Sequence, residues 1–222
     1  MERNVTSVKS RRRRYNSSGR QAQARRNQEA ILDAAEHQFL ERGYGATTIS
    51  GVATEVGVSV ETVYKAFGGK AGLVRALYDR SLRGRERASA YERSDAMAAR
   101  ETDPITIVHE WGELTTEVAA RMNPIRLLIR AAAVTDPEVA TLLADSDGKR
   151  LNRMRHNAEF LADRGYLRED ITIDKATDVL YTCSSLEIYE VLVLQRGWPP
   201  PEFARFVADF MISALLTPTE KA

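Results

Sequence analysis

Cysteine and histidine are scarce in this sequence. Cys183 is the single cysteine among 222 residues, so the chain cannot form an internal disulfide or a cysteine-based zinc site. A lone cysteine also suits the reducing cytoplasm, where we expect the protein to act. The three histidines, His37, His109 and His156, are widely separated and form no HxxxH or HExxH pair. We therefore expect no bound metal ion.

Long apolar runs are missing as well. No stretch reaches about eighteen consecutive apolar residues, so we expect no transmembrane helix and no membrane partner. The basic N-terminus is not followed by an apolar run, so we do not expect it to be a secretory signal. The seven prolines and thirteen glycines are too few for a low-complexity or collagen-like chain. The remaining composition, 43% hydrophobic and 28% charged residues, is typical of a globular protein with a core.

Recognisable catalytic patterns are also missing. The sequence contains no Gly-rich phosphate-binding loop, no G-x-S-x-G nucleophile elbow and no acid–base constellation. We therefore expect no catalytic residues, no cofactor and no enzymatic activity.

Positive charge is concentrated at the start of the chain. Residues 1–26 contain nine basic residues and one acidic residue, a net charge of +8. Residues 27–80 carry −2 and residues 81–222 carry −5, so the near-neutral total hides a basic arm on an acidic body. Such charge blocks are commonly disordered and often bind polyanions. We expect residues 1–25 to form a disordered basic arm.

The rest of the sequence favours helices, and no segment alternates polar and apolar residues as a strand would. The first helix is predicted from about Arg26 to Arg42, with Gly43 as its stop signal. Thr48 and Ser59 are predicted N-caps of two short helices, which end at Gly57 and near Phe67. A fourth helix is predicted from about residue 70 to the mid-80s. These patterns predict an all-α fold.

Later helices are predicted mainly from Asx-Pro pairs, in which an N-cap precedes a proline at the first helical position. Asp103-Pro104, Asn123-Pro124 and Asp136-Pro137 are three such pairs. Asp174 is the predicted N-cap of a further helix, and a shorter piece near residues 94–100 also fits the pattern. The main predicted helices span about residues 104–122, 124–134, 137–164, 174–196 and 201–216.

The two short helices joined by Gly57-Val58-Ser59 have the spacing of a DNA-binding helix-turn-helix. On a helical wheel, the outward face of the second short helix carries Glu61, Thr62, Tyr64 and Lys65. These residue types can reach base edges or phosphates in a major groove. Ordinary solvated helices carry them too, so a helical hairpin with a purely structural role remains an alternative.

A longer set of residues resembles, in register, the N-terminal domain of the TetR (tetracycline-repressor) family of bacterial transcription regulators. The resemblance covers about residues 27–75. The matching positions are Gly43-Tyr44-Gly45-Ala46-Thr47-Thr48-Ile49, Val52-Ala53, Gly57-Val58-Ser59, Thr62-Val63-Tyr64, Phe67, Lys70 and Leu73.

The resemblance implies an N-terminal three-helix helix-turn-helix domain joined to a C-terminal helical bundle domain. With the arm set aside, we assign DNA binding to residues 26–70. Residues 71–222 are assigned to ligand binding and dimerisation. The resemblance also implies a homodimer held largely by the last two long helices.

The resemblance further implies roles for individual residues on the DNA backbone. Thr48, with Thr47 as a second candidate, would contact phosphate at the start of the second helix. Tyr64 would contact phosphate from the third helix, and Lys70 from the start of the fourth.

Base contacts are implied for Val60, Thr62 and Lys65. Two positions depart from the family pattern. Glu61 stands where a small residue is usual, and would lie near phosphates or accept a hydrogen bond from a cytosine amine. Ala66 stands where an aromatic residue or histidine is usual. These departures concern the base preference rather than the motif.

The family places a small-molecule pocket within its C-terminal helices, and the sequence offers a few candidates for it. Each also has a plainer interpretation: a core aromatic, a solvated residue at the edge of an apolar stripe, or one arginine of the surface pair Arg126 and Arg130. The candidate ligand-binding residues are Trp111, Arg130, Asn157, Tyr181 and Glu187.

The resulting hypothesis is a homodimeric, sequence-specific DNA-binding transcription regulator. Its partners would be a double-stranded DNA operator, a second copy of the chain and an unidentified small-molecule effector. Repression relieved by that effector is the expected mode, although activation needs the same residues. The alternative is an all-helical small-molecule-binding protein or enzyme whose N-terminal hairpin is only structural.

Overall fold

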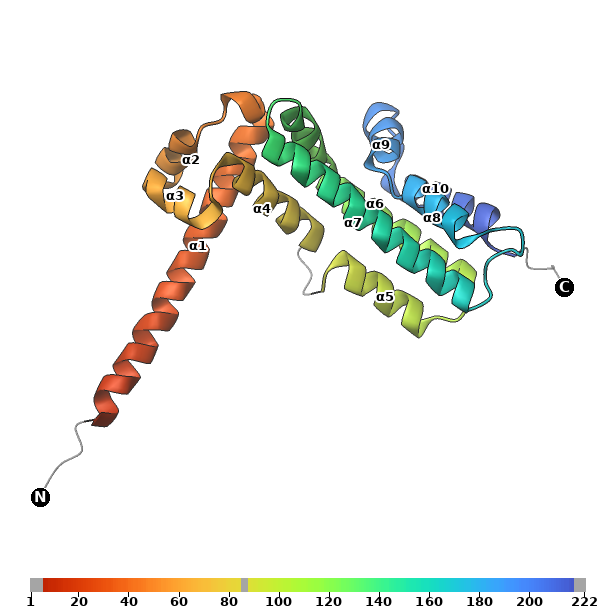
Figure 1. Cartoon of the computed structure of the whole chain (residues 1–222), viewed down its shortest axis with the longest axis horizontal. Helices are drawn as coiled ribbons and strands as arrows, with labels where there is room; N and C mark the ends of the chain where they lie inside the picture. Colours follow the sequence, from red (N-terminus) through yellow and green to blue (C-terminus); the bar gives the residue numbers. More distant parts are fainter. Residues whose placement is uncertain (1–5, 85–87, 218–222) are drawn as a thin grey trace, which may run out of the picture. The chain divides into compact units, whose positions relative to one another are not determined.

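The computed structural model describes residues 6–84 and 88–217, with side chains from residue 19 onward in these ranges. Every named element there is a helix, which confirms the predicted all-α fold (Figure 1). The chain divides into two compact units, Met1–Ala76 and Leu77–Ala222, and the division falls inside α4 (Lys70–Arg83). Within the described ranges, no helix combines the length and apolar character needed to cross a membrane.

The first unit packs three helices and the start of α4 around a small core. Its helices are α1 (Thr6–Ala46), α2 (Ile49–Val56) and α3 (Val60–Phe67). Apolar residues four apart on α1 face inward, and the two short helices add one or two side chains each. The buried residues include Ile31, Ala35, Phe39, Val52, Ala53, Val63 and Leu73.

Helix α1 begins at Thr6, so its predicted start at about Arg26 is wrong. From residue 6 onward the expected disordered arm is part of this helix, and residues 1–5 lie outside the described ranges. The segment 6–26 contains no proline and one glycine, and seven of its residues are arginines, which favour helices. The predicted stop at Gly43 is a kink inside the helix, with a φ of 78°.

In the described part of the second unit, six α-helices and one π-helical segment follow the end of α4. Helix α6 packs against α7 and α10, and α7 also packs against α8. The elements are α5 (Ala90–Arg100), α6 (Pro104–Ala133), α7 (Pro137–Asp163), α8 (Ile173–Cys183), α9 (Leu186–Tyr189), the π-helix η1 (Glu190–Gln195) and α10 (Pro200–Leu215).

Glycine and alanine bring α6 and α10 close together. A Cβ added at Gly112 of α6 would lie 2.7 Å from the carbonyl oxygen of Ala204 and 3.0 Å from the Cβ of Ala208, both on α10. A larger side chain at residue 112 would therefore push the two helices apart.

Two of the three Asx-Pro predictions are confirmed. Asp103 and Asp136 cap α6 and α7, and each is followed by proline at the first helical position. The third prediction is wrong, because Pro124 lies inside α6. Asn123 is buried, and its Nδ2 donates to the carbonyl oxygen of Leu186 at 3.1 Å. That tertiary hydrogen bond, made through the amide donor, holds the Asn123 side chain against α9, and the helix continues through Pro124.

The helix predicted over residues 174–196 is interrupted. Its first part, α8, has Thr172 rather than Asp174 as its N-cap, and it ends at Cys183. Ser184 Oγ donates to the carbonyl oxygen of Tyr181 at 3.1 Å, and Arg150 Nη1 donates to the same oxygen at 2.6 Å. Side-chain donors thus satisfy a backbone carbonyl in the last turn of α8, and the chain turns before α9.

A cluster of charges connects the C-terminal end of α4 with α5 and α6. Arg93 Nη1 of α5 donates to Glu117 of α6 at 2.8 Å, and Arg121 also pairs with Glu117. Arg121 Nε donates to the carbonyl oxygen of Ser81 in α4 at 3.3 Å. Hydrogen bonds from Arg93, with Arg121 adding to them, lower the pKa of Glu117 to about 2. The folded protein therefore favours the ionised carboxylate.

Replacing this carboxylate should make stability less sensitive to acid. We expect Glu117→Gln to lower the free energy of unfolding at pH 7 by about 1 kcal/mol, because solvent screens a side chain that is 39% exposed. A pKa of about 2 in the folded state, against 4.5 ordinarily, gives stability that is present above pH 4.5 and lost toward pH 2. The gap between wild type and variant should therefore close over that range, as measured by denaturant unfolding.

Glu113→Gln serves as the matched control, because Glu113 lies on the same helix with an exposed side chain. Its stability should follow that of the wild type at every pH. A gap between wild type and Glu117→Gln that is constant from pH 7 to pH 2 would contradict the assigned charge cluster.

Candidate functional site

Helices α2 and α3 form a helix-turn-helix whose boundaries agree with the sequence prediction. Thr48 caps α2, and its Oγ1 accepts a hydrogen bond from the backbone N–H of Gly51 at 3.0 Å. Gly57 ends α2 with a φ of 73°. Ser59 caps α3, and its Oγ accepts from the backbone N–H of Thr62 at 3.1 Å. Local hydrogen bonds thus fix both ends of the turn.

The outward face of α3 is open to solvent. Val63 is fully buried and fixes the helix against the core, whereas Val60 and Tyr64 are 41% and 52% exposed. Glu61 and Lys65 are exposed beside them. A major groove about 12 Å wide admits an α-helix such as α3, whose diameter with side chains is about 10–12 Å. This face therefore presents hydrogen-bonding and apolar groups to a groove of that size.

The two candidate threonines lie in different environments. Thr47 is only 2% exposed, and its Oγ1 donates to the carbonyl oxygen of Gly43 at 2.9 Å. Thr48 is exposed, with its Oγ1 at 3.1 Å from the Oγ of Ser50. The geometry favours Thr48 for an outside phosphate, since the hydroxyl of Thr47 holds the turn after the kink in α1.

Lys70 is positioned by the end of α1. Its Nζ lies 4.2 Å from the centroid of the Tyr44 ring and donates to the carbonyl oxygen of Gly45 at 3.4 Å. The ammonium group therefore sits beside the first turn of α4, where backbone N–H groups point outward.

The sequence analysis missed the steric role of Gly72. A Cβ on Gly72 would collide with the carbonyl oxygen of Phe67, so α4 crosses the end of α3 at a distance that only glycine allows. The signal was present as a glycine inside a helical pattern, which often marks a close approach of two segments.

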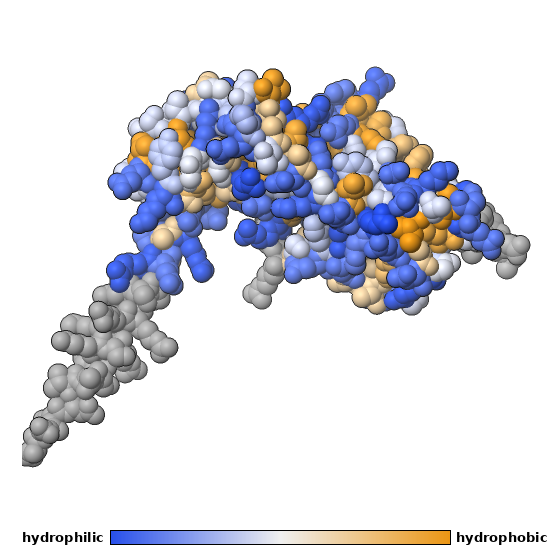
Figure 2. All heavy atoms as spheres, in the orientation of Figure 1, coloured by the Kyte–Doolittle hydropathy of each residue, from blue (hydrophilic) through white to orange (hydrophobic). Residues whose placement is uncertain are grey.

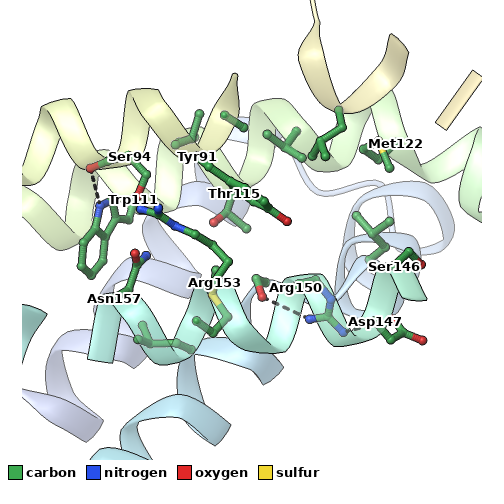
Figure 3. A pocket seen from close by; sticks show the side chains of 18 of the residues that line it. Tyr91, Ser94, Trp111, Thr115, Met122, Ser146, Asp147, Arg150, Arg153 and Asn157 are labelled. Atoms are coloured by element: carbon green, nitrogen blue, oxygen red, sulfur yellow. Dashed lines mark hydrogen bonds and ion pairs between the residues drawn. The ribbon is translucent and has the colours of Figure 1, made fainter. Parts of the chain in front are cut away.

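A cavity lies inside the second unit, among the end of α4 and helices α5, α6, α7 and α8 (Figure 3). Its volume of about 120 Å³ is several times the roughly 10–15 Å³ that one water molecule needs. Apolar and aromatic side chains make up most of its wall. They include Tyr78, Tyr91, Leu114, Met122, Met154 and Leu180. Burial raises the pKa of Tyr78 to about 12, so its hydroxyl stays protonated at neutral pH.

The structure separates the five predicted ligand-binding residues into two groups. Trp111, Asn157 and Glu187 line the cavity. Arg130 lies outside it, where its Nη1 is 3.7 Å from Glu187 Oε1. Tyr181 also lies outside, with its ring centroid 3.5 Å from the Arg150 guanidinium carbon. The Trp111 Nε1 donates to the carbonyl oxygen of Ser94 at 3.5 Å, so this indole also has a structural contact.

Three arginines that line the cavity were not predicted to do so: Arg126, Arg150 and Arg153. Two of them, Arg150 and Arg153, lie on α7, as do Met154 and Asn157 of the same lining. Leu151 on this helix is exposed.

Metal binding has no positive support in the described residues, because they contain no cluster of three or more His, Cys, Asp or Glu side chains that could hold an ion.

Comparisons with known proteins agree with this geometry. Residues 31–77 match the family model described as bacterial regulatory proteins, tetR family. The match covers the core of α1, the helix-turn-helix and the first part of α4. No curated protein sequence matches the chain.

Solved structures share the fold over most of the chain. SmeT of Stenotrophomonas maltophilia, solved with triclosan, is 20% identical, with a TM-score of 0.69 over 86% of this chain and 92% of that chain. NalD, the secondary repressor of a Pseudomonas aeruginosa multidrug efflux pump, is 18% identical, with a TM-score of 0.67 over 88% and 98%. The fatty acid degradation regulator FadR of Bacillus halodurans is 16% identical, with a TM-score of 0.67 over 84% and 94%.

The exposed face of α3 generates a prediction about duplex DNA. We expect Tyr64→Phe to weaken binding to every sequence by about 1.5–3 kcal/mol, because the phenol would lose a hydrogen bond to a charged phosphate. We expect Lys65→Ala to cost about 1–3 kcal/mol on the preferred sequence and less on others, because this side chain would contact a base. Fluorescence anisotropy with preferred and scrambled duplexes measures both effects.

Lys149→Ala is the control for this pair, because Lys149 is an exposed lysine on α7 in the second unit. It should bind both duplexes as the wild type does. Near-native affinity of Tyr64→Phe and Lys65→Ala, with unchanged circular dichroism, would remove both residues from the interface.

Proposed function

The chain belongs to the tetR family of bacterial regulatory proteins through its residues 31–77, and on this premise we propose that it is a homodimeric transcription repressor that a small molecule releases from its operator. The chain is a DNA-binding regulator. The observation that carries the finer proposal is the pairing of an exposed helix-turn-helix with an internal cavity in the other unit. Because its partner would be DNA, the proposed location of the protein is the cytoplasm. We propose no catalytic step.

The dimer would place two copies of α3 in successive major grooves. Two such helices must lie about one DNA turn, roughly 34–36 Å, or a small multiple apart. Thr48, Tyr64 and Lys70 would hold phosphates and fix the register, while the outer face of α3 would read bases. Glu61 on that face would either lie near phosphates or accept a hydrogen bond from a cytosine amine.

Release of the operator by a ligand requires that the ligand bind the form unable to bind DNA more tightly than the form able to bind it. Helix α4 supports a coupling between ligand binding and DNA binding, because it begins in the first unit and the carbonyl oxygen of Ser81 near its end accepts a hydrogen bond from Arg121 of α6. Tyr78 on the same helix lines the cavity. Two structures with a similar fold support the proposal: SmeT was solved with the small molecule triclosan, and NalD is named as a repressor.

Selection of bound duplexes from a random library tests the proposal. We expect enrichment of a palindromic site whose half-sites are separated by a whole number of DNA turns. The alternative, an all-helical binding protein or enzyme with a structural hairpin, predicts neither enrichment nor salt-dependent binding to random duplex at low ionic strength. Such a result would refute the regulator.

An apolar surface on η1 and α10 supports the homodimer. Phe203 and Val207 of α10 are buried within the unit, whereas Phe206 and Phe210 are 41% and 49% exposed. Leu194 of η1 is also exposed. Figure 2 shows hydrophobic surface over the region of α9 and α10. Exposed apolar patches of this kind commonly mark an interface between subunits.

The dimer predicts a change of mass on mutation. Wild-type protein should sediment as a dimer at micromolar concentration, with an interface of roughly 2,000 Å² or more. The double variant Phe206→Glu and Phe210→Glu should sediment as a monomer, because burying two carboxylates in an apolar interface is unfavourable. Leu151→Glu, an equally exposed leucine site on α7, should remain a dimer. A monomeric wild type would refute the assignment.

The basic start of α1 is proposed to supply non-specific affinity. Residues 27–80 carry a net charge of −2, which is unfavourable for a surface that approaches phosphates, and residues 1–26 carry +8. A basic extension can follow the backbone or enter a minor groove beside the major groove that α3 occupies. The alternative is an extension that aids solubility without touching DNA.

Salt dependence separates these alternatives. Deleting residues 1–24 should flatten the slope of log K against log salt by several units per dimer, since each neutralised phosphate contributes about −0.9. Replacing the four arginines 11–14 by glutamine should give part of the same effect at full chain length, which separates charge from length. The ranking of sequences should stay mostly unchanged. A slope that neither variant alters would leave the extension without a role in DNA binding.

A further inference from the structure

The three arginines of the cavity lining are unequally paired with their acidic neighbours. Arg126, Arg150 and Arg153 line it together with Asp147 and Glu187. Burying a guanidinium group in an apolar wall is unfavourable unless an acceptor compensates for the lost water. The partners of each arginine therefore indicate how much positive charge is left for a ligand.

Arg126 is well compensated. Its Nη2 lies 2.7 Å from Asp147 Oδ1, and its Nη1 donates to Ser146 Oγ at 3.1 Å. The carboxylate of Glu187 is shared, because it accepts from Ser185 Oγ at 2.8 Å and lies 3.7 Å from Arg130 and 4.0 Å from Arg126. The carboxylate of Asp147 is thus committed mainly to Arg126.

Arg150 depends on neutral acceptors. Its Nη1 donates to the carbonyl oxygen of Tyr181 at 2.6 Å and to Ser184 Oγ at 3.1 Å. The nearest carboxylate oxygen, on Asp147, is 3.9 Å from Nη2 and is already shared with Arg126. Burial lowers the pKa of Arg150, which agrees with a cation that lacks a close anion of its own.

Arg153 provides the second observation. Its side chain is only 9% exposed, and Figure 3 shows it extending from α7 across the cavity toward Ser94 and Tyr91. Nη2 pairs with Asp95 at 2.6 Å, but that carboxylate is half exposed and is shared with His156 at 3.2 Å. The buried Nε finds no hydrogen-bond partner among the residues that the structure describes. A buried, charged donor left in this way is unfavourable and is available to an incoming acceptor.

We propose that this cavity binds an amphipathic organic monoanion, a carboxylate with an apolar tail, whose head accepts from Arg153 Nε and lies beside Arg150. The tail would lie among Leu114, Met122 and Met154, whose side chains are apolar and adaptable. One negative charge suits the two arginines that the head group would meet, because Arg150 has no carboxylate oxygen closer than 3.9 Å and Arg153 shares Asp95 with His156. The ligand class is argued from the cavity alone, and its regulatory consequence rests on the proposed function.

Matched head groups test the class directly on the full-length protein without DNA. The probes are decanoate, 1-decanol and decyltrimethylammonium, with 4-phenylbutyrate, 4-phenylbutanol and 4-phenylbutylammonium as an aromatic series. Isothermal calorimetry should give carboxylate affinities at least about tenfold above those of the alcohols, with the cations weakest. Decyl phosphate should not exceed decanoate. Equal affinity for acids and alcohols, a preference for the cations or the phosphate, or no binding in either series would overturn the proposal.

Arg153→Met locates the head group. This change keeps the apolar stem and should reduce carboxylate affinity by about tenfold or more, while alcohol affinity changes by less than about twofold. Arg155→Met on the same helix is the matched control, because Arg155 points outward to Asp174 and should leave both affinities unchanged. Unchanged carboxylate binding in Arg153→Met would remove Arg153 from the site. The head-group comparison in wild type needs no variant, so a misfolded variant does not decide the matter.

Operator release is measured separately, by adding each probe to the protein–DNA complex. Carboxylates that bind without changing operator affinity would leave the ligand class standing and refute the proposed release. Release of operator DNA by alcohols or cations, with no preference for carboxylates, would refute the ligand class and leave the proposed release standing.

Discussion

The close approach of α6 and α10 at Gly112 is the contact on which the second unit depends. Because α10 covers one side of α6 at the distance that glycine and alanine permit, the opposite side of α6 is left to face α5 and α7. Leu114, on the side of α6 away from Gly112, belongs to the cavity wall, and Met211 of α10 also lines the cavity. The same packing turns Phe206 and Phe210 of α10 toward solvent. One steric constraint thus places both the cavity and the apolar surface.

The two units are connected through α4, whose two ends serve different purposes. Its first turn is held by Lys70 against α1 and by the absence of a side chain at Gly72. Its last turns contribute Tyr78 to the cavity wall and the carbonyl of Ser81 to Arg121. Helix α4 is thus the segment of chain that links the two units, and contacts within each unit hold the end that belongs to it.

Features fixed by short-range chemistry could be predicted from the sequence, and those fixed by distant partners could not. Thr48, Ser59, Asp103 and Asp136 were correctly assigned as caps, because the capping acceptor and its backbone donor lie within three residues. Asn123 has the same local pattern, but its amide bonds to a residue 63 positions away. The chain around Tyr181 ends its helix for a similar reason, since Arg150 donates to it from α7.

The candidate site shows the same division. The exposed face of α3 follows from the buried position of Val63 and a helical period, so the wheel placed Tyr64 and Lys65 correctly at the surface. The cavity arginines could not be assigned from a pattern, because charged residues are ordinarily placed at the surface. Their burial depends on packing among α5, α6 and α7 and on acceptors such as Asp95 and Asp147. Only three-dimensional neighbours identify them.

The π-helix η1 has a consequence for how the surface beside it can change. A π-helical segment contains an extra residue relative to an α-helix, and its wide turn is closed here by the Arg196 N–H bonding to the carbonyl oxygen of Val191 at 3.0 Å. The wide turn takes up its extra residue locally, so losing one residue there would restore α-helical hydrogen bonding and leave the segment that follows close to its present direction. Trp198, whose ring meets Phe206 edge to face at 5.5 Å, would then keep this contact. A single insertion or deletion at this turn can therefore be accommodated without changing the packing partners of the chain that follows.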